Sequence, residues 1–223
     1  MSGEPDTPIY SIGAVARMLD LPASTLRAWE ERYSLVTPGR SEGSHRLYSR
    51  GQVEQLRYLK SQIDAGMSAA DAHRLLSDEL RGGHLPHAAT PAAEERRPLV
   101  LIAERDSYAA ELAEYFLRTE GWDVIVALDA TQAKLHFDER GPDVVLLDLL
   151  ISGGAGFRLL KEFADVGAQV VAVSALNSTS EALRAGASAF LRKPLHALTL
   201  VSTMRDLVGE SALVDRRRQR VAR

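Results

Sequence analysis

The sequence predicts an α + α/β protein, in which a helical N-terminal domain precedes a doubly wound domain with a five-stranded parallel sheet. In the first third of the chain, apolar residues recur every three or four positions, the spacing of amphipathic helices. After about residue 98, short apolar runs alternate with helical patterns, which is typical of parallel strands covered on both faces. Residues 77–97 separate the two regions and gather Gly, Pro and charged residues, so they predict a linker.

The composition excludes several classes of protein. The chain has no cysteine, which rules out disulfides, a thiolate nucleophile and Cys-ligated metals. Its net charge of −3 gives no global basic field, so any contact with nucleic acid must come from a local patch. The polar, acidic N-terminus does not resemble a signal peptide, and no apolar run is long enough to span a bilayer. We therefore expect a cytoplasmic protein with no membrane partner.

Four helices are predicted in the first domain, residues 1–76, while residues 34–49 predict a loop. The expected N-caps are Ser11, Ser24 and Ser68, each of which precedes a stretch with helical spacing. The tight turn between the first two helices predicts a helix-turn-helix, whose second helix enters the major groove of DNA. The expected helices cover residues 12–19, 25–32 and 50–65, with a fourth after Ser68.

Two motifs that follow the turn make this prediction specific. Residues 25–33 read T-L-R-A-W-E-E-R-Y, and residues 45–49 read H-R-L-Y-S. In this order and spacing they resemble the winged helix-turn-helix DNA-binding domain of the MerR family, closest to that of cobalamin-dependent light-responsive repressors. The resemblance covers residues 9–76 and implies a double-stranded DNA operator as partner.

The candidate DNA-binding residues carry positive charge or a hydroxyl near the second helix and the wing. Arginine offers forked donors to phosphate, and hydroxyls at a helix N-terminus lie beside free N–H groups. Trp29 and Leu26 are instead expected in the core. Tyr48 is included because an exposed aromatic residue beside Arg46 on a loop is costly without a partner, while His45 is open between phosphate contact and simple exposure. The predicted DNA-binding residues are Ser24, Thr25, Arg27, Arg32, His45, Arg46 and Tyr48.

The chain departs from the MerR family after residue 76. Members of the family continue into a long helix that forms a coiled coil between two subunits, whereas this sequence shows no sustained heptads there. We therefore expect a homodimer formed through the C-terminal domain, with pairing driven by DNA as the alternative.

The second domain, residues 98–208, alternates five predicted strands with five predicted helices, and a basic tail, residues 209–223, follows it. The tail carries five Arg, for which a solvated end and an auxiliary phosphate contact are both open. The expected strands are residues 99–103, 124–127, 144–147, 170–173 and 189–191, and the expected helices are residues 107–120, 130–140, 157–165, 178–185 and 196–208.

Ligands of doubly wound sheets bind at the carboxyl ends of the strands. There the sequence places Asp148 and a set of further polar residues, Glu104, Arg105, Ser174 and Lys193. This set resembles the receiver domain of two-component response regulators, a flavodoxin-like fold. Residues 148–157 match the family's D-L-x-x-P-G-x-x-G-[FY] motif with Ser152 in place of Pro, Lys193-Pro194 matches its K-P pair, which is usually cis, and Phe190 matches its aromatic switch position.

The resemblance implies transfer of a phosphoryl group to Asp148, with Mg²⁺ held by that residue and two acidic residues after the first strand. Glu104 fits one of these positions, but Arg105 occupies the other and cannot ligate Mg²⁺. Asp106 could replace it after a register shift, but it is expected to cap the following helix. We therefore predict an atypical receiver, with no catalytic or metal site, no cofactor beyond weak Mg²⁺ binding near Glu104 and Asp148, and Arg105 paired with Asp148.

The favoured interpretation is a sequence-specific transcriptional regulator, controlled or dimerised by its receiver-like domain, with RNA polymerase or a signalling protein as further partners. The first alternative is a conventional response regulator phosphorylated on Asp148. A cobalamin-binding photoreceptor would need a His after the first strand, and residues 104–109 contain none. No enzyme is predicted, because the α/β domain lacks a G-x-G-x-x-G loop and a P-loop Lys. An adaptor that has lost DNA binding is disfavoured by the Arg cluster.

Overall fold

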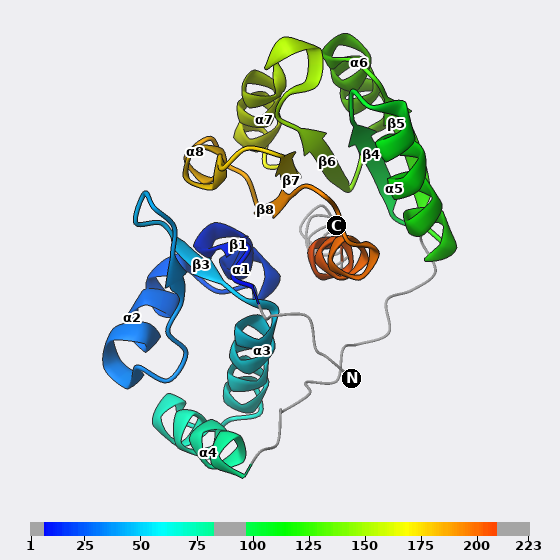
Figure 1. The fold of residues 1–223 in the computed structure, drawn as a ribbon. Coiled ribbons are helices and arrows are strands. Elements are labelled where there is room, and N and C mark those ends of the chain that lie inside the picture. The colour runs from blue at the N-terminus through cyan, green and yellow to red at the C-terminus, as the bar shows by residue number, and fades with distance from the viewer. Residues whose placement is uncertain (1–6, 83–96, 209–223) are drawn as a thin grey trace, which may run out of the picture. The chain divides into compact units, whose positions relative to one another are not determined.

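A computed structural model describes residues 7–82 and 97–208. The chain divides into two compact units, Met1–Ala92 and Ala93–Arg223, and the division falls inside the segment for which the sequence predicts a linker. Each unit is described by itself (Figure 1). The basic tail, 209–223, lies outside the described residues, as does most of the expected linker.

The N-terminal unit combines four helices with a small antiparallel sheet. Its helices are α1 (Ile12–Met18), α2 (Ala23–Tyr33), α3 (Arg50–Asp64) and α4 (Ala69–Arg81), and its strands are β1 (Tyr10–Ser11), β2 (Gly39–Arg40) and β3 (Arg46–Tyr48). β3 is central and pairs with both β1 and β2. All four predicted helices are present, but the expectation that residues 34–49 form only a loop was wrong. Strands of two or three residues are too short to show a period-2 pattern in the sequence.

Local hydrogen bonds determine where these helices begin. The Ser11 and Ser68 hydroxyls accept hydrogen bonds from N–H groups of the first turns of α1 and α4, as expected for N-caps. Ser24 is not a cap, because α2 begins at Ala23 after Pro22, so Ser24 lies within the first turn. α4 continues to Arg81, so the boundary expected at residue 76 falls inside a helix.

The core of this unit is built around β3 and the inner faces of the helices. Tyr10 and Tyr48, paired across β1 and β3, are both fully buried, as are Leu26 of α2 and Leu59 of α3. The prediction that Leu26 belongs to the core is therefore confirmed.

The C-terminal unit is a five-stranded, all-parallel sheet with helices on both faces, as predicted. Its strands run in the order β8-β7-β6-β4-β5, so β5 is an edge strand. The strands are β4 (Leu99–Ala103), β5 (Asp123–Ala127), β6 (Val144–Asp148), β7 (Gln169–Ser174) and β8 (Ala189–Arg192). The helices are α5 (Ser107–Thr119), α6 (Ala130–Arg140), α7 (Gly156–Asp165) and α8 (Thr179–Arg184), with a further helix over 197–208.

Alternate residues of each strand face the two helical layers, and one layer packs especially closely on the sheet. α6, α7 and α8 cover the face that carries Leu101, Val145 and Leu147. At the start of α7, a Cβ atom on Gly156 would lie 2.5 Å from the Leu149 Cα, so only glycine permits this approach. The strand ends are thereby fixed at one edge of the sheet, where the candidate site lies. No helix within 7–82 or 97–208 is long and apolar enough to cross a membrane.

Candidate functional site

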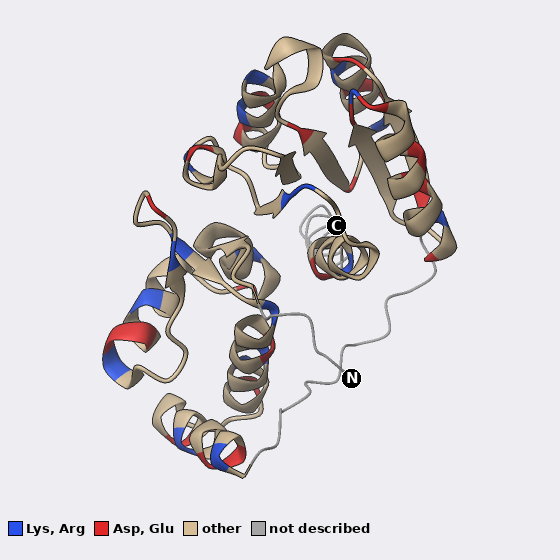
Figure 2. Cartoon of the chain, in the orientation of Figure 1, with Lys and Arg blue, Asp and Glu red and all other residues tan. Residues whose placement is uncertain are grey.

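In the N-terminal unit, the predicted DNA-binding residues of α2 lie on its outer side. Leu26 points into the core, while Ser24, Arg27 and Arg32 are exposed and Thr25 is half-buried. Arg27 has no hydrogen bond or ion pair with any described residue. The first turn of α2 has no side-chain cap, and while the Thr25 and Leu26 N–H groups donate to the Pro22 carbonyl, those of Ala23 and Ser24 are available to an anion. α2 can therefore present both cationic side chains and a helix N-terminus to phosphate, and Figure 2 shows basic and acidic positions along it.

The hairpin of β2 and β3 forms a wing that is tied to α2. Arg46 Nε donates to Glu30 Oε2 at 2.6 Å, and Arg40 lies 3.9 Å from the other oxygen of the same carboxylate. This hydrogen bond raises the pKa of Arg46. Glu30 is thus paired with two neighbouring arginines. Arg46 fixes the wing against α2, and its contact with DNA phosphate stays a prediction.

Two other wing residues differ in exposure. His45 is half-buried just before β3, and its backbone N–H donates to the Ser41 hydroxyl. Tyr48 is only 1% exposed, so its interpretation as an exposed DNA-contacting residue was wrong. The strand alternation of β3 points its ring into the core, and burial raises its pKa to about 12.

Behind α2, an aromatic cluster joins it to α4. The His73 ring stacks on Tyr33 with centroids 3.8 Å apart and meets the edge of Trp29 at 5.3 Å. Burial lowers the pKa of His73, while its hydrogen bond with the Ala69 carbonyl acts in the opposite direction. Trp29 is therefore a packing residue, as expected. The role of His73 was not predicted, because nothing in the sequence signals which helix faces meet.

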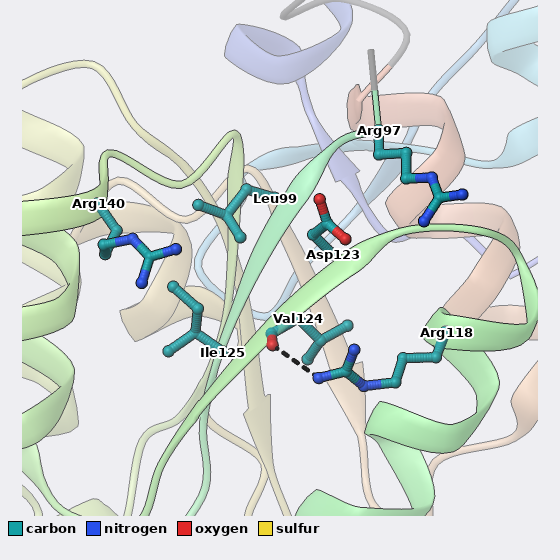
Figure 3. A pocket seen from close by; sticks show the side chains of 7 residues that line it. All are labelled: Arg97, Leu99, Arg118, Asp123, Val124, Ile125 and Arg140. Carbon is teal, nitrogen blue, oxygen red and sulfur yellow. Dashed lines mark hydrogen bonds between the residues drawn. The ribbon is translucent and has the colours of Figure 1, made fainter. Parts of the chain in front are cut away.

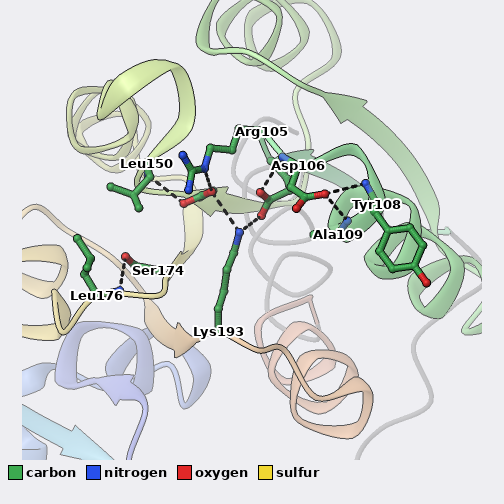
Figure 4. Close-up of polar contacts among 10 residues, drawn as sticks. Arg105, Asp106, Tyr108, Ala109, Leu150, Ser174, Leu176 and Lys193 are labelled. Atoms are coloured by element: carbon green, nitrogen blue, oxygen red, sulfur yellow. Dashed lines mark hydrogen bonds and ion pairs between the residues drawn. The ribbon is translucent and has the colours of Figure 1, made fainter.

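In the C-terminal unit, the ends of β4 and β6 and the residue after β8 bring four predicted side chains together (Figure 4). Lys193 Nζ lies 2.6 Å from Glu104 Oε2 and 3.2 Å from Asp148 Oδ2. Arg105 Nε lies 3.5 Å from the same Asp148 oxygen, which confirms the predicted pair. The two carboxylates and two cations form a cluster whose formal charges cancel.

Every carboxylate oxygen of this cluster already has a partner. Glu104 Oε1 accepts from the Asp106 N–H at 3.1 Å, and Asp148 Oδ1 accepts from the Leu150 N–H at 2.9 Å. The two remaining oxygens contact Lys193, and one of them also contacts Arg105. Burial is the main cause that raises the pKa of Glu104, and the bonds from Lys193 and the Asp106 N–H oppose it.

The other polar side chains near the cluster accept hydrogen bonds from backbone N–H groups. Asp106 caps α5, since its side chain accepts from the Tyr108 and Ala109 N–H groups, as predicted. Ser174 is buried at the end of β7, and its hydroxyl accepts from the Leu176 N–H at 3.1 Å. Ser152 adopts a left-handed conformation and accepts from the Ala130 N–H at 2.9 Å. This link to α6 was not predicted, because it depends on the course of the loop backbone.

The residues present do not fit the Mg²⁺ site that a receiver fold implies. Asp106 is occupied as a helix cap, Arg105 brings a positive charge, and the oxygens of Glu104 and Asp148 are already paired. Among the residues that the structure describes, no group of three His, Cys, Asp or Glu side chains is arranged to hold a metal ion.

The fold and these sites define a helix-turn-helix protein with a wing, joined to a doubly wound domain with paired charges at its strand ends. Family models identify both parts: residues 10–79 match the MerR HTH family regulatory proteins, and residues 100–205 match the response regulator receiver domain. The chain therefore joins a MerR helix-turn-helix domain to a receiver domain, as the resemblances implied.

Individual relatives match one part or the other. The chain is 41% identical over 71 residues to the HTH-type transcriptional regulator MlrA of Escherichia coli, which covers 32% of this chain and 29% of MlrA. It is 31% identical over 122 residues to the transcriptional regulatory protein TrcR of Mycobacterium tuberculosis, which covers 52% of this chain and 48% of TrcR. The structure of NtrX from Brucella abortus superposes with a TM-score of 0.50 at 25% identity, over 56% of this chain and 30% of NtrX. The matched segments thus span less than half of each of these proteins.

Proposed function

We propose that the chain is a sequence-specific DNA-binding transcriptional regulator. The observation that carries this proposal is the outer side of α2, where Ser24, Arg27 and Arg32 are exposed next to a helix N-terminus without a side-chain cap. In the proposed complex, α2 lies in the major groove and the wing follows the adjacent phosphates. Arginines and the N–H groups of the first turn of α2 position the protein on the DNA backbone, and Ser24 and Thr25, which belong to that turn, are proposed to meet base edges.

We further propose that the receiver domain works without ordinary phosphorylation. Phosphoryl transfer needs a divalent cation to neutralise the phosphate oxygens. In this cluster Arg105 and Lys193 already balance the charges of Glu104 and Asp148, so little electrostatic attraction remains for Mg²⁺. The alternative is a conventional response regulator, which the Asp148 and Lys193 pair at 3.2 Å favours.

The receiver domain is proposed to hold two copies of the chain together, because the sequence lacks the coiled coil of MerR proteins. Sedimentation equilibrium of the intact chain should then give a dimer, and a monomer at all concentrations would contradict this. The protein is proposed to be cytoplasmic and not an enzyme, with RNA polymerase or a signalling protein as candidate partners.

DNA binding by the intact chain tests the first proposal. A duplex selected from a random pool serves as the probe, and fluorescence anisotropy over a salt series gives affinity and slope. Arg27→Ala should weaken binding and reduce the slope of log K against log salt by about one unit if one phosphate contact is lost. Arg74→Ala on α4, also at an exposed arginine, serves as the control and should change neither. If no duplex is enriched, or if both variants behave alike, the proposed interface is wrong.

A further inference from the structure

A second feature of the C-terminal unit is a pocket at the amino-terminal end of the sheet. It lies opposite the edge that holds the Asp148 cluster. It is an open hollow against β4 and the edge strand β5, with a volume of about 680 Å³. Its lining combines basic and apolar side chains, namely Arg97, Leu99, Arg118, Asp123, Val124, Ile125 and Arg140.

Three arginines reach this pocket from separate segments. Arg97 precedes β4, Arg118 stands in the last turn of α5, and Arg140 stands in the last turn of α6. A positive charge at a helix end is favourable by itself, but Arg97 belongs to no helix. Asp123 is the one carboxylate among these lining residues, so three cations face one anion there, while Glu114 beside Arg118 and Asp143 at the Leu99 N–H carry negative charge next to the lining. Its chemistry suits an anion.

Two of the arginines are available to a ligand. The side chains of Arg97 and Arg140 are exposed and make no hydrogen bond or ion pair with any residue in 7–82 or 97–208. Arg118 is partly engaged, since it pairs with Glu114 and donates to the Val124 carbonyl at 3.1 Å. Figure 3 shows Arg118 and Arg140 on opposite sides of the strand, with Val124 and Ile125 between them.

This arrangement also narrows the class of ligand. Arg118 covers an outward-facing carbonyl of the edge strand, which hinders the addition of a peptide as a further strand. Leu99 and Ile125, whose side chains share one face of the sheet, provide an apolar floor that inorganic phosphate alone would not use. Arginine binds phosphate through paired donors, and donors on two sides of β5 suit a ligand with more than one anionic group.

We propose that this pocket binds a nucleotide that carries at least two phosphate groups. Arg97, Arg118 and Arg140 hold the phosphates, and the organic part lies on the apolar floor beside Asp123. The pocket shares no residue with the Asp148 cluster or with α2. Nucleotide binding at this pocket therefore does not depend on the DNA-binding function proposed above.

Isothermal titration calorimetry of the intact chain with the four ribonucleoside diphosphates, the matching nucleosides and pyrophosphate tests this proposal. At least one diphosphate should bind, and its nucleoside should not. Arg97→Gln and Arg140→Gln should each weaken binding by about tenfold, since each removes charge-assisted hydrogen bonds to phosphate. Arg184→Gln, an exposed position on α8 outside the pocket, is the matched control and should bind like the parent chain.

Three results would overturn the proposal. The first is no binding of any diphosphate at millimolar concentration, and the second is binding that the two pocket variants leave unchanged. The third is pyrophosphate binding as tight as that of the best nucleotide, which would remove any role for the apolar floor. If the pocket variants lower DNA affinity while no diphosphate binds, the arginines contact DNA and the nucleotide assignment is wrong.

Discussion

Replacing Arg105 by Asp should turn the charge-balanced cluster into a magnesium site. Arg105 Nε lies 3.5 Å from Asp148 Oδ2, and the Arg105 side chain is 57% exposed, so the dielectric of water is the appropriate limit. For a divalent cation about as far from the Arg105 charge as this oxygen, the repulsion at that dielectric is about 2 kcal/mol. Its removal should therefore tighten Mg²⁺ binding by about thirtyfold. The carboxylate of Asp adds an oxygen ligand, so the full effect should be larger.

Calorimetric titration with Mg²⁺ measures this effect, and two further variants separate its causes. Arg105→Gln removes the charge without adding a carboxylate and should give an intermediate affinity. Arg158→Asp makes the same charge change on the exposed side of α7, outside the cluster, and should leave the affinity unchanged. If Arg105→Asp binds Mg²⁺ within threefold of the parent chain, or if Arg158→Asp has the same effect, the inferred role of Arg105 is wrong.

Three further predictions concern the two folded units. Arg46→Ala should weaken DNA binding several-fold. Glu30→Ala, which removes the partner of Arg46 in the 2.6 Å pair but keeps the cation, should reproduce the loss only if Arg46 acts by holding the wing, and fluorescence anisotropy measures both variants. Burial lowers the pKa of His73 below its usual 6.5, so His73 binds a proton more readily in the unfolded chain than in the folded one. The free energy of unfolding, measured with urea, should therefore fall as pH drops below about 6.5. His73→Phe should flatten that dependence. Gly156→Ala should destabilise the C-terminal unit by about 1–3 kcal/mol in urea titrations, since its Cβ meets the backbone, and equal stability would contradict the close approach at α7.

The sequence predicted the C-terminal unit more completely than the N-terminal one. The five parallel strands are nearly continuous apolar runs, and each helix between them has a clear period, so the predicted and observed positions of strands and helices agree to within one or two residues. In the N-terminal unit, β1 to β3 are two or three residues long and are held by pairing between segments distant in the sequence. No local sequence pattern encodes such pairing. Tyr48 was therefore predicted to be exposed on a loop, because its place in a paired strand could not be recognised.

The candidate sites show the same division between local and tertiary information. The Arg105–Asp148 pair and the Asp106 cap could be predicted, because the ends of parallel strands meet at one edge and a cap needs only its own helix. The pairing of Glu30 specifically with Arg46, and the stacking of His73 on Tyr33, depend on how β3 and α4 pack against α2. Such contacts arise from tertiary packing, which residue spacing does not reveal.

The most direct test of the central claim is intact-protein mass spectrometry after treatment with acetyl phosphate at millimolar Mg²⁺, with Asp148→Asn as the control. DNA affinity is measured on the same samples by anisotropy. Because Arg105 and Lys193 already neutralise Glu104 and Asp148, we predict no added phosphate and an unchanged affinity for DNA. Stoichiometric phosphate that depends on Asp148, accompanied by a change in DNA affinity, would contradict the claim and identify a conventional phosphorylation-dependent response regulator.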